Sequence, residues 1–210
     1  MNSATQKITL QGGAGPIEAL LDLPAGEPRG TAVIAHPHPL FGGTMSNKVV
    51  QTLARAFVQT GWRAMRFNFR GVGASAGAYD EGRGEAIDMQ EVIRQVAPQG
   101  ALAVAGFSFG AFVTSHAVAQ LAPRLPEKIV LVGTAASRFS VAPIAPELHE
   151  RTLVLHGEQD DTVVLSSVLD WARPQALPVT VIPGVEHFFH GQLPLLRSLV
   201  VRHLLAPVQA

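Results

Sequence analysis

The sequence contains no cysteine, one tyrosine and two tryptophans among its 210 residues. Without cysteine, the chain can form no disulfide, no thiolate zinc site and no cysteine nucleophile. It also has no excess of either charge, because 16 Lys and Arg balance 16 Asp and Glu. It therefore has neither the basic field that attracts nucleic acid nor a polybasic stretch for a membrane surface. We expect neither nucleic acid nor a membrane as a partner.

The sequence also lacks an apolar run typical of a signal peptide or a membrane span. The first seven residues, Met1–Lys7, are polar and have no signal-peptide core. The longest uncharged run, Gln95–Pro123, is interrupted by Pro98 and by several glycines. A buried strand followed by a buried helix explains this run better than a membrane span. We therefore expect a cytoplasmic protein.

Apolar strands alternate with helical patterns along the chain. The expected strands are Lys7–Leu10, Ile17–Leu23, Thr31–Ala35, Ala64–Phe69, Ala101–Ala105, Lys128–Val132, Thr152–His156 and Val179–Ile182. The expected helices are Lys48–Thr60, Glu85–Val96, Phe109–Leu121, Val164–Ala172 and Leu193–Leu204. This alternation indicates an α/β fold with a mostly parallel sheet covered on both faces. With no repeat or linker, residues 1–210 are predicted to form a single domain.

The pattern Gly-x-Ser-x-Gly occurs twice, as Gly106–Gly110 and as Gly73–Gly77. It indicates a nucleophile only where a strand runs into a sharp turn that leads directly into a helix. The first copy has a predicted strand before it and a predicted helix after it, whereas the second lies in a Gly-rich loop. Ser108 is therefore predicted to be the nucleophile of a serine hydrolase with an α/β-hydrolase fold, and Ser75 is the weaker candidate.

A serine hydroxyl needs a base to take its proton, and the base needs a carboxylate to hold its tautomer. In this fold the acid and then the histidine follow later strands. Asp160 and Asp161 follow one such strand, and chain order does not separate them; Glu158 is a third, weaker candidate. His187 is the first histidine after the last predicted strand and is the expected base, with His190 as a supporting neighbour.

Backbone N–H groups usually hold the negative charge that develops on the substrate oxygen. One donor is expected to be Phe109, directly after the nucleophile. The other is expected in the loop His36–Thr44, after the third strand. The two prolines of this loop have no N–H, so His38 is the leading donor and Leu40 the second.

The histidine pairs His36/His38 and His187/His190 raise an alternative, a metal-dependent hydrolase. Because the chain has no cysteine and His187 is already explained as a base, we expect no metal and no other cofactor. In that alternative the paired histidines would have to bind the metal together.

The segment Gly133–Arg151, between the sixth strand and the acid strand, is too short for a full cap domain. We therefore expect an open site and a small-molecule substrate, a short-acyl ester. Leu40, Phe41 and Phe188 are expected to bind it. A thioesterase or amidase with the same three residues, or a non-catalytic scaffold that binds a small ligand, is the alternative. The chain is expected to be a monomer or a small homo-oligomer.

Six segments, in order along most of the chain, resemble the small cap-less bacterial α/β-hydrolases related to dienelactone hydrolase. They are His36–Met45, Asn47–Val50, Arg66–Gly77, Gly106–Gly110, His156–Asp160 and His187–His190. The resemblance implies Ser108 as nucleophile, Asp160 as acid, His187 as base, and esterase-type activity. Dienelactone hydrolase itself uses a cysteine, which this chain lacks, so its activity is not implied.

Overall fold

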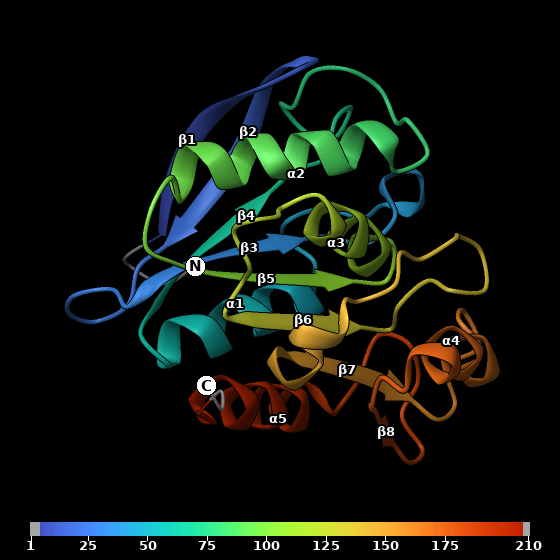
Figure 1. Ribbon diagram of the computed structural model, residues 1–210. Helices are drawn as coiled ribbons and strands as arrows, with labels where there is room; N and C mark the ends of the chain where they lie inside the picture. The colour runs from blue at the N-terminus through green and yellow to red at the C-terminus, as the bar shows by residue number, and fades with distance from the viewer. Residues whose placement is uncertain (1–4, 208–210) are drawn as a thin grey trace.

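The computed structural model describes residues 5–207 and contains an eight-stranded sheet (Figure 1). The strands are β1 Thr5–Gly12, β2 Gly15–Asp22, β3 Gly30–Ala35, β4 Trp62–Phe67, β5 Ala101–Phe107, β6 Lys128–Val132, β7 Thr152–Gly157 and β8 Val179–Ile182. Their order across the sheet is β1-β2-β4-β3-β5-β6-β7-β8. The hairpin β1–β2 joins β4 in antiparallel pairing, and all other neighbours are parallel. The predicted mostly parallel sheet is confirmed.

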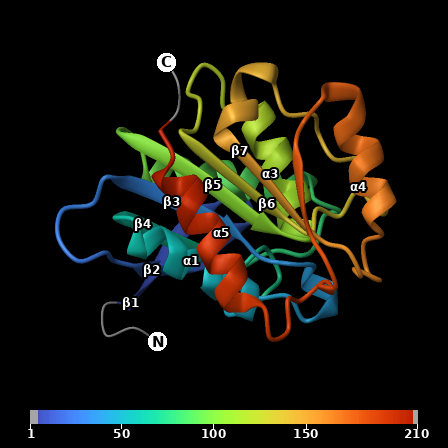
Figure 2. The ribbon, with the colours of Figure 1, turned by 90° about the horizontal axis from the view of Figure 1, so that it is seen from below.

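Helices cover both faces of the sheet (Figures 1 and 2). They are α1 Lys48–Gln59, α2 Arg83–Val96, α3 Phe109–Ala119, α4 Leu165–Ala172 and α5 Leu193–Leu205. Helices α1 and α5 pack together on one face, and α2 and α3 pack together on the other. Three short 3-10 helices, which the sequence did not indicate, are η1 Pro39–Phe41, η2 Pro146–Arg151 and η3 Arg173–Gln175.

The core lies in two layers, one on each face of the sheet. In β3, Val33 and Ala35 belong to the layer under α2 and α3, whereas Ala32 and Ile34 belong to the layer under α1 and α5. Successive side chains of a strand point to opposite faces, so a central strand between two helical layers has to be apolar at every position. This is why the middle strands are continuous apolar runs in the sequence.

The parallel strands end at one edge of the sheet, where loops bring distant parts of the chain together. The loops that follow β3, β5, β6, β7 and β8 all begin at this edge. In open α/β sheets, ligands bind beyond the carboxyl ends of the strands. The segment between β6 and β7 forms a loop and η2, so the fold is an α/β-hydrolase fold with no large cap, as expected.

Within residues 5–207, no helix is both long enough and apolar enough to span a lipid bilayer.

Candidate active site

Ser108 occupies a tight turn between β5 and α3. Its backbone has φ 56° and ψ −118°, a left-handed φ that residues other than glycine rarely adopt. A Cβ on Gly106 would lie 2.2 Å from the carbonyl oxygen of Gly110, and a Cβ on Gly110 would lie 2.4 Å from that of Ala35. Only glycine allows strand and helix to approach so closely. The turn therefore has the strand–turn–helix form of a nucleophile elbow.

The side chains of Ser108, His187 and Asp160 form a continuous chain of hydrogen bonds. Oγ of Ser108 lies 3.0 Å from Nε2 of His187, and Nδ1 of His187 lies 2.6 Å from Oδ2 of Asp160. All three residues are buried. Ser108 and Asp160 are 79 and 27 positions from His187 in the chain, so the parallel sheet is what brings them together.

Asp160 is held by its own loop. Its Oδ1 accepts the backbone N–H groups of Thr162, at 3.0 Å, and Val163, at 2.7 Å. The other carboxylate oxygen is left to face His187. Asp161 is exposed and, among residues 5–207, its side chain accepts one hydrogen bond, from the hydroxyl of Thr162 at 3.3 Å. Glu158 is exposed and accepts the N–H of Gly184 in the loop after β8. The structure thus separates two aspartates that chain order left equivalent.

His156, the last-but-one residue of β7, lies next to Asp160. Its Nε2 donates to the carbonyl oxygen of Val163 at 2.8 Å and lies 3.5 Å from Oδ2 of Asp160. Burial lowers the pKa of His156, and the nearby Asp160 carboxylate opposes that shift only in part. His156 is therefore a neutral donor that fixes the turn carrying the acid.

The loop that carries His187 is shaped by Glu186, which the sequence analysis missed. The Glu186 carboxylate accepts the N–H groups of Phe188 at 2.8 Å and of His190 at 2.6 Å, and lies 3.1 Å from Nδ1 of His190. Desolvation raises the pKa of Glu186, but these N–H groups and the two histidines outweigh it, so the pKa is lowered. His190 pairs with Glu186 rather than with His187. The sequence does place a glutamate two residues before Phe188 and four before His190. A side chain at that spacing can accept the backbone N–H groups of a turn.

The loop after β3 lies against the elbow. The N–H of Leu40 donates to Nδ1 of His38 at 3.2 Å, and the N–H groups of Phe41 and Gly43 donate to the carbonyl oxygen of His38. Within residues 5–207, no hydrogen bond occupies the N–H of His38. Phe109 is the first residue of α3, so its N–H has no acceptor inside the helix. Among the described residues of this loop and the elbow, the N–H groups of His38 and Phe109 remain open, as does that of Gly42.

A cavity of about 240 Å³ opens over Ser108. Of the three residues predicted to bind substrate, Phe41 and Phe188 line this cavity, whereas Leu40 does not and is 67% exposed. Its remaining wall includes Phe109 and, from the loop after β6, Arg138 and Phe139. Four phenylalanine rings therefore contribute to the wall of the cavity.

His36, one of the paired histidines that raised the metal-dependent alternative, is bonded on both sides within the protein. Its Nδ1–H donates to the carbonyl oxygen of Pro37 at 2.6 Å, and its Nε2 accepts the N–H of Phe69 at 3.0 Å. Burial lowers the pKa of His36 to about 4, although the bond to Pro37 raises it in part. Both ring nitrogens are thus occupied within the protein. Among the described residues, no three His, Asp or Glu side chains converge as a metal-binding group.

Ser75, the serine of the second Gly-x-Ser-x-Gly pattern, has a different set of partners. Its hydroxyl donates to the carbonyl oxygen of Asn68 at 2.8 Å and accepts the N–H of Glu18 at 3.0 Å. It is buried. Ser75 therefore ties a long loop to strand β2, and no histidine bonds to it among the described residues.

Comparisons with known proteins identify the family of the chain. The family model of the X-Pro dipeptidyl-peptidases (S15 family) matches residues 17–142, a range that includes Ser108 and ends before Asp160 and His187. An uncharacterised protein of Rickettsia prowazekii is 30% identical over 181 residues, 75% of this chain and 71% of the relative.

Two solved structures match almost from end to end. An α/β serine hydrolase without a lid from Xanthomonas campestris is 34% identical, with a TM-score of 0.87, covering 100% of this chain and 99% of that one. An α/β serine hydrolase homologue from Coxiella burnetii is 38% identical, with a TM-score of 0.81, covering 96% and 97%. The family model spans more than half of the chain, and the two serine hydrolase structures span nearly all of it. This chain belongs to the S15 family and is a serine hydrolase with an α/β-hydrolase fold and no large cap.

Proposed function

We propose that the protein hydrolyses short-acyl carboxylic esters through an acyl-enzyme formed on Ser108. The single observation that supports this most directly is the hydrogen-bonded chain from Ser108 through His187 to Asp160, set on a nucleophile elbow. Such a chain activates a serine hydroxyl, which is otherwise a poor nucleophile.

In the proposed reaction, Nε2 of His187 takes the hydroxyl proton of Ser108 while Oγ attacks the ester carbonyl carbon. The N–H groups of Phe109 and His38 hold the resulting oxyanion. The tetrahedral intermediate collapses, the alcohol leaves with the proton from His187, and Ser108 remains acylated. Water, deprotonated by His187, then attacks the acyl-enzyme and releases the acid. Asp160 keeps its negative charge throughout and stabilises the imidazolium.

The size and lining of the cavity favour a short, apolar acyl group. Its volume of about 240 Å³ is below the range of about 300–1,000 Å³ common for ligand pockets. Phe41, Phe139 and Phe188 provide apolar contact surface on its walls. A long acyl chain would extend out of the cavity into solvent.

A second candidate is peptide hydrolysis, which the description of the matching family model favours. An enzyme that releases N-terminal dipeptides has to hold an α-ammonium group, and a carboxylate is the natural partner for it. No Asp or Glu is among the described residues that line the cavity, whereas Arg138 is. A positively charged wall disfavours an ammonium group, so we rank ester hydrolysis first.

The test compares p-nitrophenyl acetate, butyrate and octanoate with alanyl-prolyl p-nitroanilide. We expect the highest kcat/KM for acetate or butyrate and no turnover of the anilide. A fluorophosphonate probe should label the peptide containing Ser108, as read by mass spectrometry. Faster cleavage of the anilide would favour the peptidase. Absence of labelling and of turnover would favour a non-catalytic scaffold, and loss of activity with EDTA would favour a metal enzyme.

A further inference from the structure

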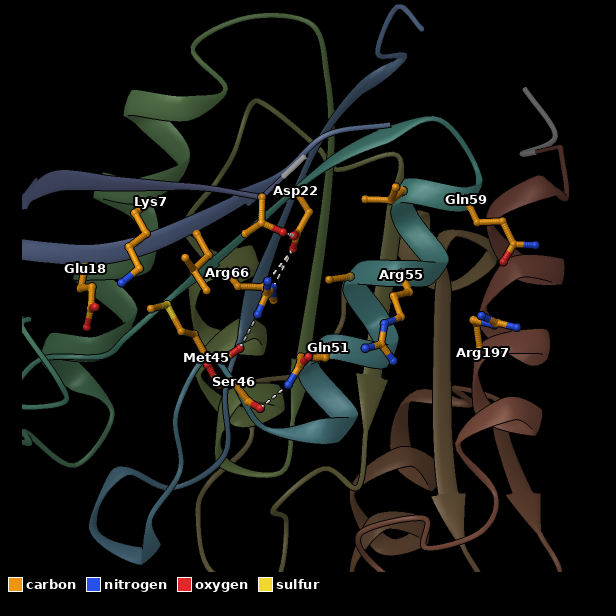
Figure 3. Close-up of a pocket in the computed structure, with 14 residues that line it drawn as sticks. Lys7, Glu18, Asp22, Met45, Ser46, Gln51, Arg55, Gln59, Arg66 and Arg197 are labelled. Atoms are coloured by element: carbon orange, nitrogen blue, oxygen red, sulfur yellow. Dashed lines mark hydrogen bonds and ion pairs between the residues drawn. The ribbon is translucent and has the colours of Figure 1, made fainter. Parts of the chain in front are cut away.

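A second cavity, of about 510 Å³, lies between the hairpin β1–β2, strand β4 and helix α1, with Arg197 of α5 on its wall (Figure 3). Its volume is more than twice that of the cavity over Ser108, and the two share no lining residue. The proposed ester hydrolysis does not use it. A volume of 510 Å³ lies within the range of about 300–1,000 Å³ typical of small-molecule sites.

The wall of this cavity is rich in positive charge. Four cationic and two acidic residues line it, namely Lys7, Arg55, Arg66, Arg197, Glu18 and Asp22. The chain as a whole has a formal net charge of zero, so the excess of cations is local. Cations gathered in a concave surface raise the local concentration of anions.

Both carboxylates already have partners inside the protein. Asp22 accepts from Arg66 at 2.8 Å and from the hydroxyl of Thr5 at 2.5 Å. Glu18 accepts the side-chain amide of Asn68 at 2.8 Å and a backbone N–H at 3.0 Å. The Asp22–Arg66 ion pair is buried, so it lines the cavity without adding net charge.

The other three cations have no such partners. Within residues 5–207, no salt bridge of 4.0 Å or less involves Lys7, Arg55 or Arg197. Arg55 and Arg197 also line the same adjoining hollow of about 150 Å³, and Figure 3 shows them on the neighbouring helices α1 and α5. Two guanidinium groups on one hollow repel each other, and an anion between them would relieve that repulsion.

We propose that this cavity binds a small organic molecule with two or more phosphate or carboxylate groups. A guanidinium presents its N–H donors in a fork that matches either group. Figure 3 places Lys7 at the opposite end of the cavity from Arg55 and Arg197, which suits a second anionic group. Gln51 and Gln59 add neutral polar contacts to the wall.

The carbon skeleton of the ligand would rest on the apolar part of the wall. Leu20, Met45 and Val58 line the cavity, and Figure 3 places Met45 between Lys7 and the two arginines. A ligand with anionic groups at both ends and a short carbon body therefore suits a cavity with cations at its two ends and some apolar lining.

The test is isothermal titration calorimetry of the full chain with citrate and, separately, with pyrophosphate. Ionic strength is held constant with sodium chloride. Tighter binding of citrate would identify carboxylates as the preferred groups, and tighter binding of pyrophosphate would identify phosphates. Either result requires saturable binding with a stoichiometry near one. Absence of saturable heat with both probes would overturn the proposal.

The variants separate this cavity from general surface charge and from the proposed catalysis. The double variant Arg55→Gln/Arg197→Gln is expected to raise Kd by about tenfold or more for each guanidinium removed. Arg202→Gln, on the exposed surface of the same helix α5, and Ser108→Ala are expected to bind as the wild type does. Equal weakening by Arg202→Gln would overturn the proposal. Lys7→Gln, at the other end, should weaken binding by a smaller factor, which keeps the test decisive if the double variant is unstable.

Discussion

Ser75 and Ser108 stand at the centre of the same five-residue pattern, but the backbone around them differs. In Gly73–Gly77 both glycines have a left-handed φ, of 57° and 86°, and the serine does not. In Gly106–Gly110 the serine has a φ of 56°, and neither glycine has a positive φ. Around Ser75 the glycines adopt the left-handed φ that the turn needs. Around Ser108 the glycines allow the strand and the helix to approach closely, and the serine itself adopts the strained φ.

The hydroxyl groups differ in the same way. The Ser75 hydroxyl bonds to two backbone groups and closes a loop onto β2. The Ser108 hydroxyl bonds to His187, whose other nitrogen faces Asp160. The five-residue pattern therefore forms a catalytic turn only where a strand precedes it and a helix follows it.

The largest expected effect is on the hydrolysis of p-nitrophenyl butyrate. Ser108→Ala should lower kcat by about 10⁵-fold, because the variant has no nucleophile and retains only binding and oxyanion contacts. Ser75→Ala, the matched control, should keep kcat within about threefold, since its hydroxyl contacts no reacting atom. Initial rates of both purified variants measure this. A comparable loss of kcat in the two variants would contradict the assignment of Ser108, and not Ser75, as the nucleophile.

The adjacent aspartates offer the next largest contrast. Asp160→Asn should lower kcat by about 10⁴-fold, because an amide neither fixes the tautomer of His187 nor stabilises its charged form. Asp161→Asn, one position away and exposed, should stay within about threefold of the wild type. The reverse order of activities would assign the acid to Asp161. Circular dichroism spectra control for folding of both variants.

Acidification should lower the stability of the fold through two histidines, His36 after β3 and His203 in α5, whose Nε2 bonds to the carbonyl oxygen of Arg151. Burial holds the pKa of His36 and of His203 at about 4, below the ordinary 6.5. Between pH 4 and 6.5 these histidines bind protons in the unfolded chain but not in the folded chain. The free energy of unfolding therefore falls as the pH drops from 6.5 to 4. Above pH 6.5 the histidines contribute a constant amount to stability. Each histidine contributes up to about 3 kcal/mol.

Urea unfolding at pH 7, 5.5 and 4.5 measures this loss. The variant His203→Gln removes one of the two histidines and should show a shallower decline than the wild type over the same range. An unchanged slope in His203→Gln would mean that other groups dominate the acid response. Because His36 accepts the N–H of Phe69, its protonation also removes a contact next to the loop of Ser75.

The two pairs of glycines should respond differently to an added methyl group. Gly106→Ala should lower the free energy of unfolding by about 3 kcal/mol, because the Cβ of the new alanine would overlap the backbone of Gly110. Gly73→Ala should cost about 1–2 kcal/mol for its left-handed φ, since the nearest atom there is the end of the flexible Glu18 side chain. Thermal and urea unfolding measure both. Equal losses of unfolding free energy in the two variants would contradict the view that Gly106 is needed for close packing and Gly73 for its left-handed φ.

The smallest expected effect concerns the stability role of Ser75. Ser75→Ala leaves the carbonyl oxygen of Asn68 and the N–H of Glu18 without their side-chain partner. We expect a loss of about 1–2 kcal/mol in the free energy of unfolding. Ser75→Thr, which keeps the hydroxyl, is the matched control. A loss that is larger in Ser75→Thr than in Ser75→Ala would show that packing, and not hydrogen bonding, governs this site.

Much of the fold could be read from the sequence because its local patterns agree with one another. Continuous apolar runs such as Ala101–Ala105 are what a strand needs when helices cover both faces of the sheet. The predicted strands and helices appear in the structure at the expected places, with ends that shift by a few residues. The three 3-10 helices were missed, because such short elements have no periodicity of their own.

The sequence by itself determined the fold class, the context that distinguishes Ser108 from Ser75, and the order of acid and base candidates, because each depends on residues that are neighbours in the chain. Only the tertiary structure decided that Asp160 and not Asp161 faces His187, that Glu186 shapes the base loop, and that Leu40 is outside the cavity over Ser108. It alone brought Arg55 and Arg197 to one hollow from helices far apart in sequence. The direction of a side chain at the edge of the sheet depends on contacts with distant segments, and no local pattern encodes them.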